Sequence, residues 1–206
     1  LAVFAAKNYG CKVTTTTISE EQFQYAKARV EKEELEEQIT LLKNDYRDLE
    51  GQYDKLVSVE MIEADGKQYL PTFFKTCNRL LKPHGKMALQ AITIADQREK
   101  AYARSVDFIQ KHIFPGGFLP SLSQMTQLFK RNTNMVVRDA FDFGLSYAKT
   151  LNIWAQNFNE KAEELAKFGY DERFSRLWNY YLSYCEGGFL EKRVSVVQVV
   201  ADKSQL

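Results

Sequence analysis

Short apolar runs alternate with amphipathic stretches in the first part of the chain. LAVFAAKNYG has helical spacing and ends at a glycine suited to a helix C-terminus, whereas the β-branched CKVTTTTIS predicts a buried strand. Ser19 suits the N-cap of a helix over residues 19–38, with Gln22 at the capping-box position. The pattern therefore opens as helix, strand, helix. Two further strands are predicted at ITLLK and KLVSV, on either side of the polar loop NDYRDLEGQ.

The alternation continues through the next thirty or so residues. QYLPTFFKTCNRLL predicts a helix that Pro71 interrupts early, and KPHG predicts a turn before the strand KMALQAITI. Strands and helices that alternate at these lengths favour a mostly parallel sheet covered on both faces. The expected fold class is therefore α/β.

Beyond residue 95 the pattern changes to helices, a Pro/Gly loop and two late strands. Two late strands with helices between them predict an antiparallel addition at one sheet edge. We expect residues 95–134 to form a helical insert over the carboxyl ends of the strands, where ligands bind in open α/β folds. The segments are EKAYARSVDFIQKHI (helix), IFPGGFLPS (loop), SLSQMTQLFKRN (helix), MVVRDAFDFG (strand), SYAKTLNIWAQNFNEKAEEL and DERFSRLWNYYLSYCEGGF (helices), and RVSVVQVVA (strand).

Composition narrows the function classes. The 206 residues suit one domain over residues 1–206, and a formal net charge of +1 does not predict a nucleic-acid partner. Cys11, Cys77 and Cys185 lack the spacing of a zinc site or a disulfide framework, so no metal is predicted and the thiols are expected to be free in a reducing cytosol. Neither a membrane-spanning apolar run nor a signal peptide is recognised.

Two acids follow the predicted strand KLVSV. Glu60 and Glu63 lie three residues apart, at the end of a strand that is expected to be buried. Carboxylates at such a strand end are typical of the rim of an active site. Each acid can also be a solvated loop residue when it is considered alone.

Seven motifs occur in order along the chain: TTTTISEEQ, LLKNDYRDL, SVEMIEADG, LLKPHGKMALQAITI, IFPGGFLPS, DFGLSYAKTLNIW and FSRLWNYYLSYCEGGF. Together they closely resemble the cyclopropane-fatty-acyl-phospholipid synthase family. These enzymes depend on S-adenosylmethionine and have the Rossmann-like class I methyltransferase fold, which the resemblance implies for this chain. LAVFAAKNYG matches the helix that follows the family's Gly-rich cofactor loop. It begins mid-helix without an initiator Met, so we expect that the upstream part with this loop is missing.

The resemblance assigns two segments to S-adenosylmethionine. One borders the ribose at the end of the second strand of the family fold, and the other follows the third strand beside the adenine. Considered alone, the first segment is an ordinary helix N-cap and the second is a turn. The matching residues are Thr17, Ile18, Ser19 and Gln22 at the ribose, and Asn44, Asp45 and Tyr46 at the adenine.

The resemblance also implies a bicarbonate ion that acts as a base beside the donor methyl group. Glu63 matches the acid that binds this ion, whereas Glu60 has no such counterpart. Ile92 matches a backbone contact to the ion, and Tyr147 matches its tyrosine ligand. Gln90 stands where the best-known members have a histidine; an amide can donate a hydrogen bond to an oxyanion but cannot shuttle a proton.

The implied reaction adds a methylene or methyl group to the double bond of an unsaturated phospholipid acyl chain, and leaves open a cyclopropane or a methylene-branched product. Aromatic faces stabilise the resulting carbocation, and Phe114, Phe118 and Phe143 are the candidates for substrate binding, with core packing as their alternative role. Phe114, Phe118 and Leu119 form either an apolar lip at the membrane or a buried loop plug.

The expected location is cytoplasmic and peripheral, at the inner membrane surface, and a homodimer is left open. Two other interpretations stay open as well. The first is an S-adenosylmethionine-dependent N- or C-methyltransferase that acts on a small molecule, which predicts activity without lipid. The second is a non-catalytic scaffold, which predicts no binding of the methyl donor.

Overall fold

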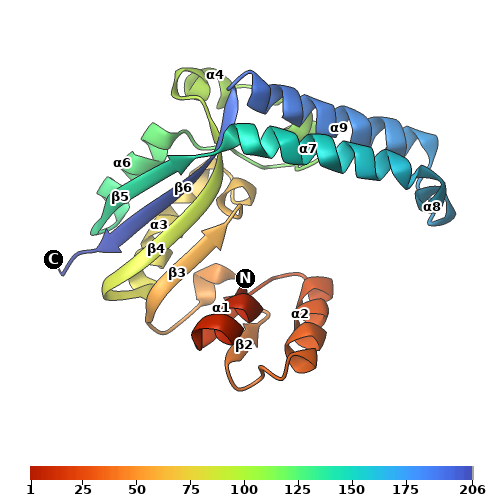
Figure 1. Ribbon diagram of the computed structural model, residues 1–206. Coiled ribbons are helices and arrows are strands. Elements are labelled where there is room, and N and C mark those ends of the chain that lie inside the picture. Colours follow the sequence, from red (N-terminus) through yellow and green to blue (C-terminus); the bar gives the residue numbers. More distant parts are fainter. Residues whose placement is uncertain (206) are drawn as a thin grey trace. The chain divides into compact units, whose positions relative to one another are not determined.

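The computed structural model describes residues 1–205, and its internal contacts divide the chain into two compact units. The first unit comprises residues 1–51 and the second begins at Gln52. Each unit combines helices with a sheet (Figure 1).

The first unit contains two helices and a two-stranded parallel sheet. Helix α1 (Ala2–Tyr9) ends at Gly10, whose φ of 62° lies in the left-handed region that favours glycine, as predicted. Strands β1 (Val13–Thr16) and β2 (Ile39–Leu42) confirm two predicted strands, and α2 (Glu20–Lys32) connects them. Four buried side chains form the core of this unit: Ala6, Val30, Leu35 and Ile39.

Helix α2 is shorter than the predicted helix over residues 19–38. It ends at Lys32, and Glu34 turns the chain with a φ of 56°. The turn carries Leu35 into the core, where it is 7% exposed, and its N–H donates to the Val30 carbonyl at 3.1 Å. Leu35 is the only apolar residue in the charged run EELEEQ. The helix ends before it because burial of this side chain outweighs the helix propensity of its neighbours.

The second unit contains a four-stranded sheet in the order β3-β4-β6-β5. Strands β3 (Tyr53–Val59) and β4 (Leu81–Ile94) are parallel, whereas β6 (Val194–Lys203) is antiparallel to both β4 and β5 (Met135–Asp142). The two late strands therefore form the predicted antiparallel edge (Figure 1). The last strand of the chain lies inside the sheet, between β4 and β5.

Two local predictions in this unit are wrong. The KPHG segment is not a turn before a strand, because β4 already begins at Leu81 and the segment forms an irregularity within it. His84 has a φ of 61° there, and the register with β3 shifts at this point. Pro71 does not interrupt the following helix; it lies in the first turn of α3 (Leu70–Leu80), where its missing N–H costs no hydrogen bond.

Helices α3 and α6 (Leu122–Asn132) cover one face of this sheet (Figure 1). The Phe74 ring of α3 meets the Phe129 ring of α6 edge-on, with centroids 4.7 Å apart. Alternate residues of β4 point to this face, because side chains alternate along a strand. The buried residues of β4 with this spacing are Met87, Leu89, Ala91 and Thr93.

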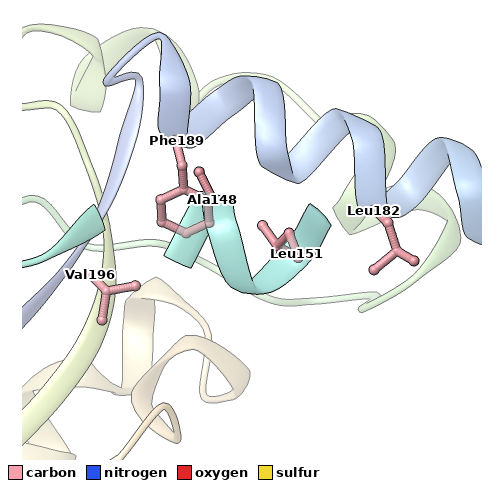
Figure 2. Packing of buried hydrophobic residues seen from close by; sticks show 5 residues of the cluster. All are labelled: Ala148, Leu151, Leu182, Phe189 and Val196. Atoms are coloured by element: carbon pink, nitrogen blue, oxygen red, sulfur yellow. The ribbon is translucent and has the colours of Figure 1, made fainter. Parts of the chain in front are cut away.

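Between β5 and β6 the chain forms a helical hairpin. Helices α7 (Gly144–Glu160) and α9 (Glu172–Leu190) lie side by side, joined by the short α8 (Ala162–Lys167). Their contact continues onto β6 through one apolar cluster (Figure 2). Its buried members are Ala148, Leu151, Leu182, Phe189 and Val196.

The region of residues 95–134 contains short helices, as the sequence predicts, but one of the predicted helices is divided. The expected helix over residues 99–113 is two short helices, α4 (Glu99–Tyr102) and α5 (Phe108–His112), because Asp107 starts the second with a capping box. Ile94 bridges to Ser121, so residues 95–121 leave the carboxyl end of β4 and return to it. Among the helices of residues 1–205, none combines the length and apolar character that a membrane crossing requires.

Candidate active site

Three elements of the second unit converge on the carboxylate of Glu60, directly after β3. Its Oε1 accepts a hydrogen bond from Gln90 Nε2 of β4 at 2.7 Å, and its Oε2 accepts one from the Tyr147 hydroxyl of α7 at 2.9 Å. The Glu60 N–H donates to the Gln90 carbonyl at 2.8 Å. Burial and the bond to Glu60 raise the pKa of Tyr147, so its hydroxyl remains a donor.

The orientation of the Gln90 amide is set by a neighbouring strand. Gln198 of β6 lies directly opposite Gln90 in the antiparallel register, and its Nε2 donates to Gln90 Oε1 at 2.8 Å. The amide oxygen of Gln90 is thereby occupied, and its NH₂ group faces Glu60. Glu60 is therefore held by charge-assisted hydrogen bonds from two rigid elements.

Glu63 lies in a 3-10 turn (Ile62–Ala64) next to this network. Its Oε1 accepts from the Ile92 N–H at 2.5 Å, whereas its buried Oε2 has no hydrogen-bond partner within residues 1–205. Burial raises the pKa of Glu63 to about 7, the bond from Ile92 opposes this, and the charge of Glu60 adds to the increase. Glu63 thus changes its charge near neutral pH.

The raised pKa of Glu63 predicts a pH dependence of stability. Its contribution is fully present below pH 4.5, where the carboxyl is protonated in the folded and the unfolded chain, and is lost as the pH rises through about 7. We expect the free energy of unfolding of the wild type to fall by about 2 kcal/mol between pH 5 and 8, because one pKa unit corresponds to about 1.4 kcal/mol and partial exposure reduces the effect. This decrease should be absent in Glu63→Gln.

Urea unfolding of the full-length protein at both pH values measures this difference. Glu191→Gln, at the exposed end of α9, is the matched control and should leave the pH dependence unchanged. An equal pH dependence in wild type and Glu63→Gln would contradict the raised pKa.

The four residues predicted as catalytic are brought together, but in two groups. Glu63 accepts from the Ile92 backbone N–H, whereas Gln90 and Tyr147 both donate to Glu60. Glu60, for which the resemblance gives no counterpart, is the common acceptor of the second group. Its position directly after a strand was a signal in the sequence, but its partners are 30 and 87 residues away along the chain.

The described side chains do not fit the implied bicarbonate ion in this arrangement. An oxyanion needs donors, and the three that the resemblance assigns to it already donate to carboxylates. A further anion here would also face the charge of Glu60. No step of the reaction is therefore assigned to bicarbonate.

The residues predicted to border the ribose lie at the end of β1 in the first unit. Ser19 caps α2 by accepting from the Gln22 N–H at 3.3 Å, as predicted. The reciprocal half of the capping box is absent: the Thr17 hydroxyl donates to Gln22 Oε1 at 2.8 Å and accepts from the Ser19 N–H at 3.1 Å. Ile18 is 79% exposed beside these hydroxyl groups.

The residues predicted beside the adenine follow β2, at the same edge of the small parallel sheet. The Asn44 carbonyl accepts from the Thr16 hydroxyl, which ties this loop to β1. Asp45 caps the short helix that Tyr46 begins, and its bonds to Arg47 lower the Asp45 pKa to about 2. Hydroxyl, amide and carboxylate groups beside an exposed isoleucine suit a nucleoside, so these residues fit S-adenosylmethionine.

The three aromatic candidates for substrate binding have different environments. Phe118 is only 5% exposed and its N–H donates to the Glu63 carbonyl at 2.8 Å, so of the two predicted roles it is the loop plug and not the lip. A Cβ on Gly117 would lie 3.3 Å from the same carbonyl, which shows how closely this loop approaches Glu63. Phe114 is 57% exposed, and Phe143 is partly buried against the hairpin cluster.

Comparison with known proteins identifies relatives across nearly the whole chain. The family model described as mycolic acid cyclopropane synthetase matches residues 1–199. The tuberculostearic acid methyltransferase UfaA1 of Mycobacterium tuberculosis is 39% identical over 92% of this chain and 44% of its own length. The cyclopropane-fatty-acyl-phospholipid synthase of Escherichia coli is 38% identical over 97% of this chain and 50% of its own length. The chain thus spans about half the length of these relatives.

Solved structures of two cyclopropane synthases share the fold of this chain. The mycolic acid cyclopropane synthase CmaA1, in complex with SAH and CTAB, matches 97% of this chain and 73% of its own with a TM-score of 0.89 and 25% identity. The cyclopropane synthase MmaA2 from Mycobacterium tuberculosis matches with a TM-score of 0.88 at 22% identity. The α/β class I methyltransferase fold predicted from the sequence is confirmed.

Proposed function

Because the chain belongs to the mycolic acid cyclopropane synthetase family, we propose that the whole protein transfers a one-carbon group from S-adenosylmethionine to the double bond of an unsaturated phospholipid acyl chain. The observation that carries this proposal is the pair of carboxyl groups, Glu60 and Glu63, at the carboxyl end of β3. Ligands bind at this end of the strands in open α/β folds.

The two carboxyl groups suit a reaction in which positive charge moves onto the substrate. S-adenosylmethionine, when bound, supplies an electrophilic methyl group on a positively charged sulfur. An isolated alkene is a weak nucleophile. When one of its carbons bonds to the methyl group, the other carbon becomes electron-deficient and needs stabilisation. The fixed charge of Glu60 and the unpaired Oε2 of Glu63 provide negative charge that is oriented before the reaction.

The donor site in this proposal is formed by the residues after β1 and β2. Thr17, Ile18, Ser19 and Gln22 would hold the ribose, and Asn44, Asp45 and Tyr46 the adenine. For Asp45 the role is narrower than the sequence suggests, because its carboxylate already binds Arg47.

The substrate side of the proposal places the enzyme at a membrane surface, peripheral and on the cytoplasmic side. Phe114 is the exposed member of the predicted lip and would contact the acyl region, whereas Phe118 closes the loop over Glu63. Sedimentation with anionic vesicles tests this: binding by Phe114→Ser equal to that of wild type would contradict the role of Phe114.

The function is tested with the full-length enzyme and methyl-labelled S-adenosylmethionine. We expect label in the acyl chains of monounsaturated phospholipid vesicles and none in fully saturated vesicles. A panel of small amines serves as the alternative substrate. Label in an amine but not in lipid would overturn the proposal in favour of a small-molecule methyltransferase, and failure to bind the donor would favour a scaffold.

A further inference from the structure

The backbone of Glu60 has a conformation that its side chain does not favour. Its φ is 49°, in the left-handed region that non-glycine residues seldom adopt. Such a conformation is strained and is held by the surrounding structure, here by the bond from the Glu60 N–H to the Gln90 carbonyl. Strain of this kind collects at functional sites, and a glycine would remove it at no steric cost.

The carboxylate of Glu60 is fixed but not saturated. Each of its oxygens accepts one hydrogen bond, from Gln90 and from Tyr147. A carboxylate offers about four lone-pair positions, so two remain for a proton from another molecule. The two donors cannot themselves act as bases, since the Gln90 amide does not titrate and the Tyr147 pKa is raised.

We propose that Glu60 is the catalytic base of the lipid reaction and takes the position that the resemblance gives to bicarbonate. This inference rests on the proposed function. The donors predicted to hold the ion, Gln90 and Tyr147, hold the Glu60 carboxylate instead. Gln90, Tyr147 and Gln198 are then positioning residues, because they orient Glu60 and not the substrate.

The step balances without an added co-reactant. The π electrons of the alkene form the bond to the methyl carbon while the bond from that carbon to the donor sulfur breaks. The electron pair of the broken bond stays on the sulfur, so the donor would leave as neutral S-adenosylhomocysteine, and the adjacent chain carbon becomes positive. Glu60 removes a proton from the transferred methyl group, and the C–H electron pair closes the ring to the positive carbon. If a hydride shift first moves the positive charge to the methylated carbon, the same electron pair forms a methylene double bond. Glu60 is left as a carboxylic acid and returns the proton to water.

The dependence of turnover on bicarbonate distinguishes the two candidate bases, the Glu60 carboxylate and a bound bicarbonate ion. Full-length wild type, Glu60→Gly and Glu60→Gln are assayed on monounsaturated vesicles in buffer freed of carbon dioxide, with and without added bicarbonate or formate. We expect wild-type turnover to be independent of the added ion. Without the added ion, the turnover of both variants should be about 10²–10⁴-fold lower than that of the wild type, which is the typical contribution of a general base.

The two variants differ in the space that they leave for an added ion. Glu60→Gly removes the side chain, suits the positive φ, and frees both donors for an ion, so we expect bicarbonate or formate to restore its turnover at least tenfold, as a small part of the general-base effect. Glu60→Gln fills the same space, and the added ion should not restore it. Binding of S-adenosylhomocysteine, measured by calorimetry, should be equal in all three proteins.

Three results would overturn the inference. Wild-type turnover that requires bicarbonate would assign the base to the ion, and an undiminished Glu60→Gly in ion-free buffer would remove Glu60 from the reaction. Equal loss in both variants with no ion rescue would reduce Glu60 to a structural tie between β3, β4 and α7. Failure of the proposed function itself looks different: wild type would bind S-adenosylhomocysteine but label no lipid under any condition.

Discussion

Glu63→Gln is expected to lower kcat/KM of the full-length enzyme for unsaturated phospholipid by about 10²-fold, the effect typical of removing one preorganised electrostatic contact. The amide still accepts the bond from the Ile92 N–H, so the local fold is retained. What is lost is the negative charge on the buried, unpaired oxygen that stabilises the positive substrate.

The same role of Glu63 predicts how kcat/KM changes with pH. The charged form of Glu63 is the useful one, and burial raises its pKa to about 7. Wild-type kcat/KM should therefore rise tenfold per pH unit below about pH 7 and level off above it. Glu63→Gln should lack this limb, whereas the exposed control Glu191→Gln should keep both the rate and the limb. A limb near pH 7 that persists in Glu63→Gln would contradict the assignment.

Phe74→Ala is expected to cost about 3–5 kcal/mol of folding free energy, the usual range for a buried phenylalanine. Phe74 is 0% exposed, and its ring contacts Phe73 at 5.4 Å and Phe129 at 4.7 Å between centroids. Its removal leaves a cavity where α3 meets α6 beneath the sheet, and neighbouring aromatic rings cannot close it without leaving their rotamers.

Urea unfolding of the full-length protein measures this cost. Phe168→Ala is the matched control, since Phe168 is 74% exposed, and it should change stability by less than about 0.5 kcal/mol. A loss below about 1 kcal/mol for Phe74→Ala would show that the contact of α3 with α6 is not part of the core.

Periodicity predicted the elements well where one signal dominated. The β-branched run VTTT and the alternating LQAITI are strands, and the two late strands pair antiparallel across the helical hairpin that joins them. The predictions failed where two local signals competed. Charged residues after Lys32 favour a longer α2, but burial of Leu35 ends it, and Asp107 divides one predicted helix into two.

The site was only partly predictable for a different reason. The resemblance identified Glu63, Gln90, Ile92 and Tyr147 without their mutual contacts. The bond between Tyr147 and Glu60 joins residues 87 positions apart, and it depends on α7 following β5 at the sheet edge. No local pattern around Glu60 specifies two donors from distant elements, or a φ of 49°.

The most direct test of the account follows the hydrogens of the transferred methyl group. Full-length enzyme is incubated with S-adenosylmethionine that carries a CD₃ group and with monounsaturated phospholipid vesicles, and the released acyl chains are analysed by mass. Methyl transfer followed by proton loss from that methyl predicts chains that gain one carbon and two deuterium atoms, for a ring and for a methylene branch alike. Chains that keep all three deuterium atoms, or chains without any label, would contradict the account.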